Sequence, residues 1–556
     1  MNKSLAAMAA SAVMAFVCPP QSAYAQVFKV GSFSACTTAN CQSVVTHNLG
    51  VVPSAMILWT DGKTGTTFTA HFLWGFGMTD GTNTWSWGAG SQNNVSTASL
   101  ASRRNWNSVL HLIQGTNGTG TVISEASFTS WTSTQFTITW TTNGGTAYTV
   151  HYLLIGGASV SAQVVSWLAP STTTADCCPA TAKPTTTTFQ PDLVLNVNGG
   201  YQMSGCSACS GSASSRAGFG LGVMDPGGNM WANGFISWAG VTTKDTQRGQ
   251  QATGKVIYGF TNALAVQPQA VACTTSPCLY ANGFRFNYTT DFTGPLETAL
   301  ALHNVNFKIG TFNKCSSSGG CSNQNAISGL GFQPGVVILT SFQTTTSANP
   351  IANSMFGFGA SDGTNEASSA LTDADAVGTS SVWGIDSSTK AFIKVNNVGT
   401  ASVAPTVDAQ GDVTMNSDGF TMTWSTNDTA TTEMLYLALG PLNATSVTLA
   451  SFTATRLPDG KVRLDWRTGY EVDNVGFRLY REQNGKRVRI NSSLVPGTAV
   501  IGGGRGKGEQ TYTWSDTKIP SDGGPVQYWL EDVDLKGKTT WHGPIAPSGP
   551  TDRVRR

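Results

Sequence analysis

Two tryptophans near the start of the chain have the type and spacing of a sugar-binding surface. Trp85 and Trp87 stand two positions apart in a strand-like segment, so their side chains share a face. Arg103, Arg104 and Trp106 follow soon after. An indole stacks on the apolar C–H face of a sugar ring, and guanidinium groups bind its hydroxyls. These five residues predict a ligand-binding site for glycan; the alternative is that both tryptophans pack inside the protein, as large aromatics usually do.

Sequence signatures of the common catalytic centres do not occur. The chain has no G-x-S-x-G, H-E-x-x-H, P-loop or dinucleotide-binding motif. Four of the six histidines fall in the first third of the chain: His47, His71, His111 and His151. They would serve as metal ligands or a general base only if the fold brought them together. We therefore expect no catalytic residues, no metal ligands and no cofactor.

An aspartate recurs three times after a Gly-x-Gly segment, as Asp80, Asp225 and Asp362. Asp-Gly and Asp-Pro-Gly are turn sequences, because the carboxylate bonds nearby backbone N–H groups and glycine tolerates positive φ. We interpret the three aspartates as turn residues. Binding of Ca²⁺ is the alternative, although it would need more oxygen ligands close together.

The start of the chain predicts export. A positive start, an apolar run from Ser4 to Val17 and the sequence Ala23-Tyr24-Ala25 resemble a signal peptide of residues 1–25. No later run has the ~20 apolar residues that span a membrane. Only 11% of residues are charged, against roughly 25% on average, and a net charge of +1 argues against nucleic acid as the partner. The chain is expected to be secreted, extracellular or held at the cell surface, with no transmembrane segment.

Ten cysteines follow the predicted signal peptide, and an even number in an exported protein favours disulfides. The expected disulfide cysteines are Cys36, Cys41, Cys177, Cys178, Cys206, Cys209, Cys273, Cys278, Cys315 and Cys321. Three pairs are local, Cys36 with Cys41, Cys273 with Cys278 and Cys315 with Cys321. The vicinal Cys177 and Cys178 are expected to pair with Cys206 and Cys209, and a four-cysteine zinc site is the alternative for that group.

The motifs around the aspartates show that one domain occurs three times. The aspartates are 145 and 137 residues apart, and each follows a proline-led apolar run and precedes an aromatic strand pattern. This spacing fits whole domains rather than a solenoid. We expect repeat 1 at 26–158, repeat 2 at 159–305 and repeat 3 at 306–445.

Short strands with a period of two dominate the repeats. Phe136, Ile138 and Trp140 alternate with threonines, and Asn-Gly and Asp-Gly dipeptides separate the strands. The expected fold is all-β, with each repeat an antiparallel, jelly-roll-like β-sandwich. The run from Gly329 through Pro334 to Ile338 resembles the β-rich repeats of phage tail and bacterial surface proteins, which implies a binding or structural module.

The end of the chain differs from the repeats. Residues 446–556 hold 17 of the 32 Lys and Arg residues but 12 of the 31 Asp and Glu residues. A tryptophan on an early strand, Trp466, and a tyrosine that opens a late one, Tyr528, make the C-terminal module at 446–548 resemble a fibronectin type III domain. Such modules act as spacers or docking pieces. A flexible basic tail is expected at 549–556.

These features favour a non-catalytic, secreted or surface protein that binds extracellular polysaccharide or a surface glycan, or mediates attachment. Two alternatives remain open. One is an exported polysaccharide-active enzyme with its site in repeat 1. The other is a structural surface-layer or filament subunit, which would self-associate.

Overall fold

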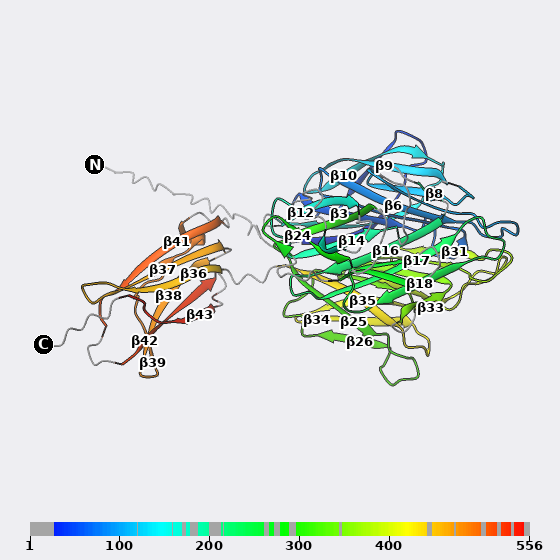
Figure 1. Ribbon diagram of the computed structural model, residues 1–556. Coiled ribbons are helices and arrows are strands. Elements are labelled where there is room, and N and C mark those ends of the chain that lie inside the picture. Colours follow the sequence, from blue (N-terminus) through cyan, green and yellow to red (C-terminus); the bar gives the residue numbers. More distant parts are fainter. Residues whose placement is uncertain are drawn as a thin grey trace, which may run out of the picture.

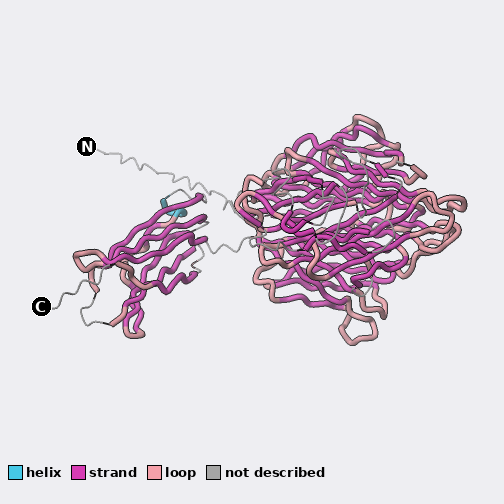
Figure 2. Tube along the Cα trace, in the orientation of Figure 1, coloured by secondary structure: helices cyan, strands magenta, loops and turns pink. Residues whose placement is uncertain are grey.

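The structure of the chain is a computed structural model, and nearly all of its regular elements are β-strands. Within the described residues the one helix is the single turn α1 (Thr498–Ile501), so the predicted all-β class is confirmed (Figure 2). The described residues are 27–118, 120–157, 160–168, 174–177, 187–199, 213–214, 216–260, 266–271, 279–288, 296–343, 347–441, 447–471, 474–501, 507–519, 524–534, 537 and 539–549.

Repeat 1 contains a seven-stranded and a four-stranded antiparallel sheet. The order of the larger sheet is β1 (Val27–Ser34), β11 (Thr149–Gly156), β3 (Pro53–Thr60), β5 (Phe72–Thr79), β6 (Thr84–Ser91), β7 (Ala101–Trp106) and β15 (Ala213–Ser214). The order of the smaller sheet is β2 (Gln42–Thr46), β10 (Gln135–Asn143), β9 (Thr121–Trp131) and β8 (Leu110–Gln114).

Repeat 2 has the same two sheets. Its larger sheet runs β12 (Ser161–Leu168), β24 (Leu296–His303), β14 (Leu193–Asn198), β16 (Arg216–Met224), β17 (Met230–Trp238), β18 (Thr246–Gln251) and β28 (Ser347–Ala352). Its smaller sheet runs β13 (Thr174–Cys177), β23 (Phe286–Tyr288), β20 (Val266–Val271) and β19 (Ile257–Phe260), beside the short pair β21 (Leu279–Tyr280) and β22 (Gly283–Phe284).

Repeat 3 follows the same order. Its larger sheet runs β25 (Asn306–Asn313), β35 (Glu433–Gly440), β27 (Val336–Ser341), β29 (Ser354–Ser361), β30 (Glu366–Asp373), β31 (Val382–Ser387) and β4 (Thr69–Ala70). Its smaller sheet runs β26 (Gln324–Ser328), β34 (Gly419–Thr426), β33 (Val407–Asn416) and β32 (Phe392–Val395).

The last strand of each larger sheet comes from a different repeat. β15 of repeat 2 pairs with β7 of repeat 1, and β28 of repeat 3 pairs with β18 of repeat 2. β4 of repeat 1 pairs with β31 of repeat 3, which closes a circle. The sequence predicts three separate sandwiches, whereas each repeat here gives one strand to a neighbour. The three repeats therefore form one unit through this circular exchange of strands, which we call the three-repeat body; it is the larger part of the molecule in Figure 1.

The larger sheets of all three repeats share one hydrophobic core. Trp74, Phe219 and Phe356 come from the corresponding strands β5, β16 and β29 and are fully buried. Their ring centroids lie 5.3, 5.0 and 5.8 Å apart, so they form a triangle at the centre of the body. Each repeat also has an outer core, to which Trp140 and Trp424 contribute in repeats 1 and 3. Burial of both central and outer faces stabilises the body as a unit.

The recurring Gly-x-Gly segments have a structural reason. At the second glycine of each copy, Gly77, Gly222 and Gly359, an added Cβ would lie 1.8, 1.9 and 2.1 Å from a backbone carbonyl oxygen. These oxygens belong to the residues just before β8, β19 and β32 of the smaller sheets. Only glycine allows the second layer to approach so closely.

The C-terminal module is a separate two-sheet sandwich to one side of the body (Figure 1). One sheet runs β36 (Val447–Arg456), β37 (Val462–Glu471) and β41 (Lys507–Asp516). The other runs β39 (Lys486–Arg489), β38 (Asn474–Gln483), β42 (Val526–Asp534) and β43 (Thr539–Ile545), with β40 (Val495–Pro496) also on β38. Trp466 and Tyr528 lie in its core. The fibronectin type III resemblance stays a prediction.

Two of the expected disulfides are present, Cys36–Cys41 and Cys315–Cys321, with Cα atoms 6.2 and 6.1 Å apart. The other expected cysteines, Cys178, Cys206, Cys209, Cys273 and Cys278, lie outside the described residues, as does the side chain of Cys177. Among the described residues, no helix is long and apolar enough to cross a membrane.

Candidate functional site

The five residues predicted to bind glycan in repeat 1 lie on neighbouring strands but on two faces of the sheet. Trp85 and Trp87 share one face of β6, as expected. The register pairs Ser86 with Trp106 and Gly88 with Arg104, so Trp106 and Arg104 lie on the opposite face. A single ligand cannot contact all five side chains.

Trp87 and Arg103 are buried where repeat 1 meets repeat 2. Trp87 is 2% exposed, and its indole N–H donates to Thr298 Oγ1 of repeat 2 at 2.9 Å. Arg103 is fully buried and donates to the carbonyl oxygen of Gly199. The prediction of an exposed ligand-binding pair is therefore wrong for Trp87 and Arg103, because the neighbouring repeat covers this face of the sheet. Trp85 is half-buried against the central core.

Arg104 and Trp106 are half-buried on the outer face and contact each other. The Arg104 guanidinium lies 4.2 Å from the Trp106 ring centroid and 2.6 Å from Glu125 Oε2. This cation–π contact and ion pair occupy the arginine within repeat 1. The pair is separated by the sheet from Trp85 and does not complete the predicted site.

All three predicted turn aspartates bond within their turns, Asp225 to Asn229, and Asp80 and Asp362 also link the repeats. Asp80 accepts hydrogen bonds from the Thr82 and Asn83 backbone N–H groups at 2.8 and 2.6 Å, which confirms the turn. It also accepts one from the Val164 N–H of repeat 2 at 2.8 Å. In the same way, Asp362 of repeat 3 accepts from the Val30 N–H of repeat 1 at 2.9 Å. Each of these last two carboxylates therefore supports both its turn and the junction with the next repeat.

The histidines of repeat 1 have separate environments. His111 Nδ1 lies 2.7 Å from Ser86 Oγ, and burial lowers the pKa of His111 to about 3. His47 Nδ1 accepts from the Leu49 backbone N–H at 3.0 Å, and His71 Nδ1 from that of Asn93 at 2.9 Å. Within the described part of the chain, no group of three or more His, Cys, Asp or Glu residues is placed to hold a metal ion.

The junction between repeats 3 and 1 holds a buried ionic cluster of Asp61, Lys63, His151 and Asp386. Asp386 accepts from the backbone N–H groups of Asp61 and Lys63, each at 3.0 Å. Burial opposes its ionisation, but the neighbouring His151 ring and the hydrogen bonds from Ser369 and the Asp61 backbone outweigh burial and lower the pKa of Asp386. Burial raises the pKa of Asp61 well above its usual value and lowers that of Lys63. Asp386 is therefore the carboxyl group of this cluster whose ionised form is favoured, at the junction between repeats 3 and 1.

A chain of hydrogen-bonding groups leads from this cluster to a surface cavity of about 450 Å³. Ser32 Oγ lies 2.7 Å from His151 Nδ1, and His151 Nε2 lies 3.4 Å from Asp386 Oδ1. Ser32 lines the cavity together with Glu366, a residue of repeat 3 whose pKa burial raises to about 8. No sequence pattern predicts this arrangement, because Ser32, His151 and Asp386 are far apart in the chain.

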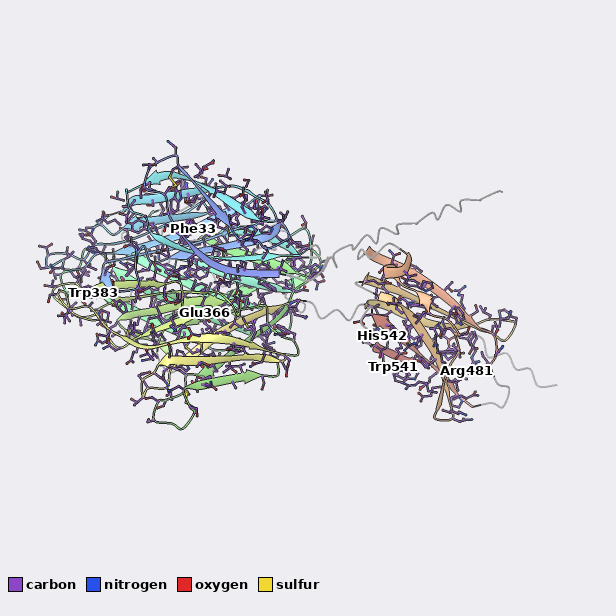
Figure 3. All side chains as sticks on the ribbon, turned by 180° about the vertical axis from the view of Figure 1, so that it is seen from behind. Phe33, Glu366, Trp383, Arg481, Trp541 and His542 are labelled. Carbon is purple, nitrogen blue, oxygen red and sulfur yellow. A yellow bond between two sulfur atoms is a disulfide. The ribbon has the colours of Figure 1, made fainter. Side chains whose placement is uncertain are left out.

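An exposed aromatic surface does exist, but on the C-terminal module. We call it the aromatic platform; it consists of Tyr480, Trp529 and Trp541 with Arg487 above them. Trp541 is 42% exposed, and its ring centroid lies 4.8 Å from that of Tyr480 and 6.4 Å from that of Trp529. The Arg487 guanidinium lies 4.0 Å from the Trp529 centroid and 4.8 Å from the Trp541 centroid. Figure 3 labels Trp541 on the module, away from Glu366 on the body.

Strand alternation places the platform on the outer face of its sheet. Tyr480 on β38 is the direct partner of Trp529 on β42, and Leu479 and Leu530, next to them in sequence, point into the core. Trp541 on β43 is paired with Glu531, which lies on the same outer face. Sequence analysis missed this site, although the phase of the alternation around Leu479 and Leu530 was the signal that could have revealed it.

Comparison of the chain with protein-family models finds no match, and comparison with curated protein sequences finds none either. The function of this chain is therefore argued from its own sequence and geometry.

Proposed function

We propose that the chain is a secreted or cell-surface protein, without catalysis of its own, that binds extracellular glycan through the aromatic platform of its C-terminal module. The observation that carries the proposal is the exposure of Trp541 beside Tyr480, Trp529 and Arg487. Trp541 offers an exposed indole on the outer sheet face, with the half-buried rings of Tyr480 and Trp529 beside it. The Arg487 guanidinium, which pairs with Glu482 at 2.9 Å, lies over both indoles and places a cation at the same site. This is the chemistry expected of a surface that stacks sugar rings.

The three-repeat body supports a mechanical role in the same proposal. Its continuous core and exchanged strands make a rigid unit, to which the module is attached as the binding part. The disulfides Cys36–Cys41 and Cys315–Cys321 support export, since disulfides persist in oxidising compartments. Attachment to a surface glycan would then be the task of the whole chain.

A glycan array with the full chain tests the proposal. Stacking on one aromatic side chain is worth on the order of 1 kcal/mol, so Trp541→Ala and Trp529→Ala should each weaken binding about five-fold. Trp106→Ala in repeat 1 is the matched control and should leave binding unchanged. Binding that survives both platform substitutions but is lost in Trp106→Ala would refute the platform. If the chain bound no glycan at all, the result would favour a structural surface-layer or filament subunit instead.

A second candidate function is an exported enzyme that cleaves polysaccharide esters, with Ser32 and His151 of repeat 1 at its site. The contacts of Ser32 with His151 and of His151 with Asp386 have the order of groups that activates a serine nucleophile. Release of acetate from a panel of acetylated polysaccharides, absent with Ser32→Ala, would support this second function. If the native chain released no acetate, this second candidate function would be excluded.

A further inference from the structure

The C-terminal module has a cationic groove next to the aromatic platform. Its cavity of about 520 Å³ is lined by Arg481, Arg489 and Lys518, with Trp514 as an aromatic wall. Arg481 pairs with Asp516 at 2.7 Å and donates to the Lys518 carbonyl oxygen at 2.8 Å. Arg481 is therefore neutralised and held in place by its own module.

The other two cations of the groove are available to a ligand. Arg489 and Lys518 are exposed, and no described carboxylate lies within 4.0 Å of either charged group. The Arg489 guanidinium has one long contact, 3.5 Å from Nε to Asn491 Oδ1. Among the described residues the positive charge of these two side chains is therefore uncompensated, in a module (446–548) that holds 14 of the 32 Lys and Arg residues of the chain but 11 of the 31 Asp and Glu residues.

Arg489 connects the groove with the platform. It is the direct cross-strand partner of Tyr480, so its side chain leaves β39 on the platform face, and it also lines the groove. A polymer that stacks on Tyr480 and Trp541 would therefore reach Arg489 and Lys518 with its next residues. Guanidinium and ammonium groups bind carboxylate and sulfate oxygens through charge-assisted hydrogen bonds.

We infer that the glycan is an acidic polysaccharide, whose sugar rings stack on the aromatic platform while a carboxylate or sulfate group binds in the cationic groove. This inference rests on the proposed function and adds the charge of the ligand. Charge complementarity sets the preference: a neutral polymer gains only the stacking, whereas an acidic one also gains contacts with Arg489 and Lys518, which no described carboxylate neutralises.

Titration calorimetry of the full chain with two forms of one polymer tests the inference. Polygalacturonate and its fully methyl-esterified form share a backbone and differ in charge. The acidic form should bind about ten-fold more tightly at low salt, and the difference should shrink as salt is raised. The double variant Arg489→Gln, Lys518→Gln should reduce affinity for the acidic form to that for the ester.

The control removes two positive charges from the other sheet of the module. Lys461 and Arg463 are 44% and 51% exposed there, so Lys461→Gln with Arg463→Gln should leave both affinities unchanged. If the two polymers bound equally tightly and Trp541→Ala weakened both, the inference about charge would be overturned, while the proposed function would stand. Binding indifferent to Trp541→Ala would overturn the proposed function itself. Equally tight binding of single-stranded DNA that depends on Arg489 and Lys518 alone would also overturn the inference.

Discussion

Trp87→Ala gives the sharpest test of the junction between repeats 1 and 2. A tryptophan buries about 200–250 Å², and at ~25 cal/mol per Å² the transfer contribution is roughly 5–6 kcal/mol as an upper value. Measured Trp→Ala substitutions in cores cost about 3–5 kcal/mol. The side chain is 2% exposed and donates to Thr298, so we expect a loss of about 4 kcal/mol.

The assay is calorimetric unfolding of the full chain. Because the repeats share a core, the body of roughly 400 residues should melt as one unit, with an unfolding entropy of about 0.9 kcal/mol per kelvin. A loss of about 4 kcal/mol then lowers the midpoint of its transition by about 4–5 °C. Trp87→Phe keeps most of the volume but loses the hydrogen bond, and should cost only about 1–2 kcal/mol.

Trp541→Ala is the contrasting substitution outside the body, and it should leave the transition of the body in place to within about 1 °C. If Trp87→Ala left the body transition in place and instead weakened glycan binding several-fold, Trp87 would be an accessible stacking residue. The description of a covered junction would then be wrong.

Three further predictions concern other parts of the body. Gly384→Ala should destabilise the body by about 3 kcal/mol or more, because the added Cβ would lie 1.4 Å from a buried carboxylate oxygen of repeat 1. Gly378→Ala is the control, because its Cβ would have no atom within 4 Å, and thermal melting of the two variants compares them. Burial raises the pKa of Asp373 to about 7, so between pH ~4 and ~7 the folded chain holds a proton that the unfolded chain has released, and stability falls as pH rises through this window. Asp373→Asn should therefore raise the melting midpoint more at pH 8 than at pH 4.5. Reduction of the Cys36–Cys41 disulfide, which closes a short loop, should cost only about 2 kcal/mol and leave the circular dichroism of the sheets unchanged.

Local pattern predicted the strands and their inward faces where the covering layer belongs to the same repeat. Phe136, Ile138 and Trp140 alternate in the sequence, and all three are fully buried against the other sheet of repeat 1. The recurrence of Gly77 was also visible in sequence. Its cause was not, because the carbonyl oxygen that excludes a side chain comes from another strand.

Pattern failed where the covering layer comes from another repeat. Alternation placed Trp85 and Trp87 on one face, but whether that face is open depends on Thr298, 211 residues further along the chain. No periodicity carries such information. The outward face of the platform strand was predictable from alternation, since Leu479 fixes which residues of β38 point outward.

The circular exchange of β4, β15 and β28 has a consequence for how many copies the chain needs. A head-to-tail contact either closes on itself or continues without limit. Here the third copy receives its last strand from the first, so within the described residues no donor strand and no acceptor edge of this exchange is left unpaired. A chain shortened by one repeat would display both, and each molecule could extend the sheet of the next. The third copy thus closes the head-to-tail exchange of strands, so that a contact able to propagate into a fibre is completed within one molecule.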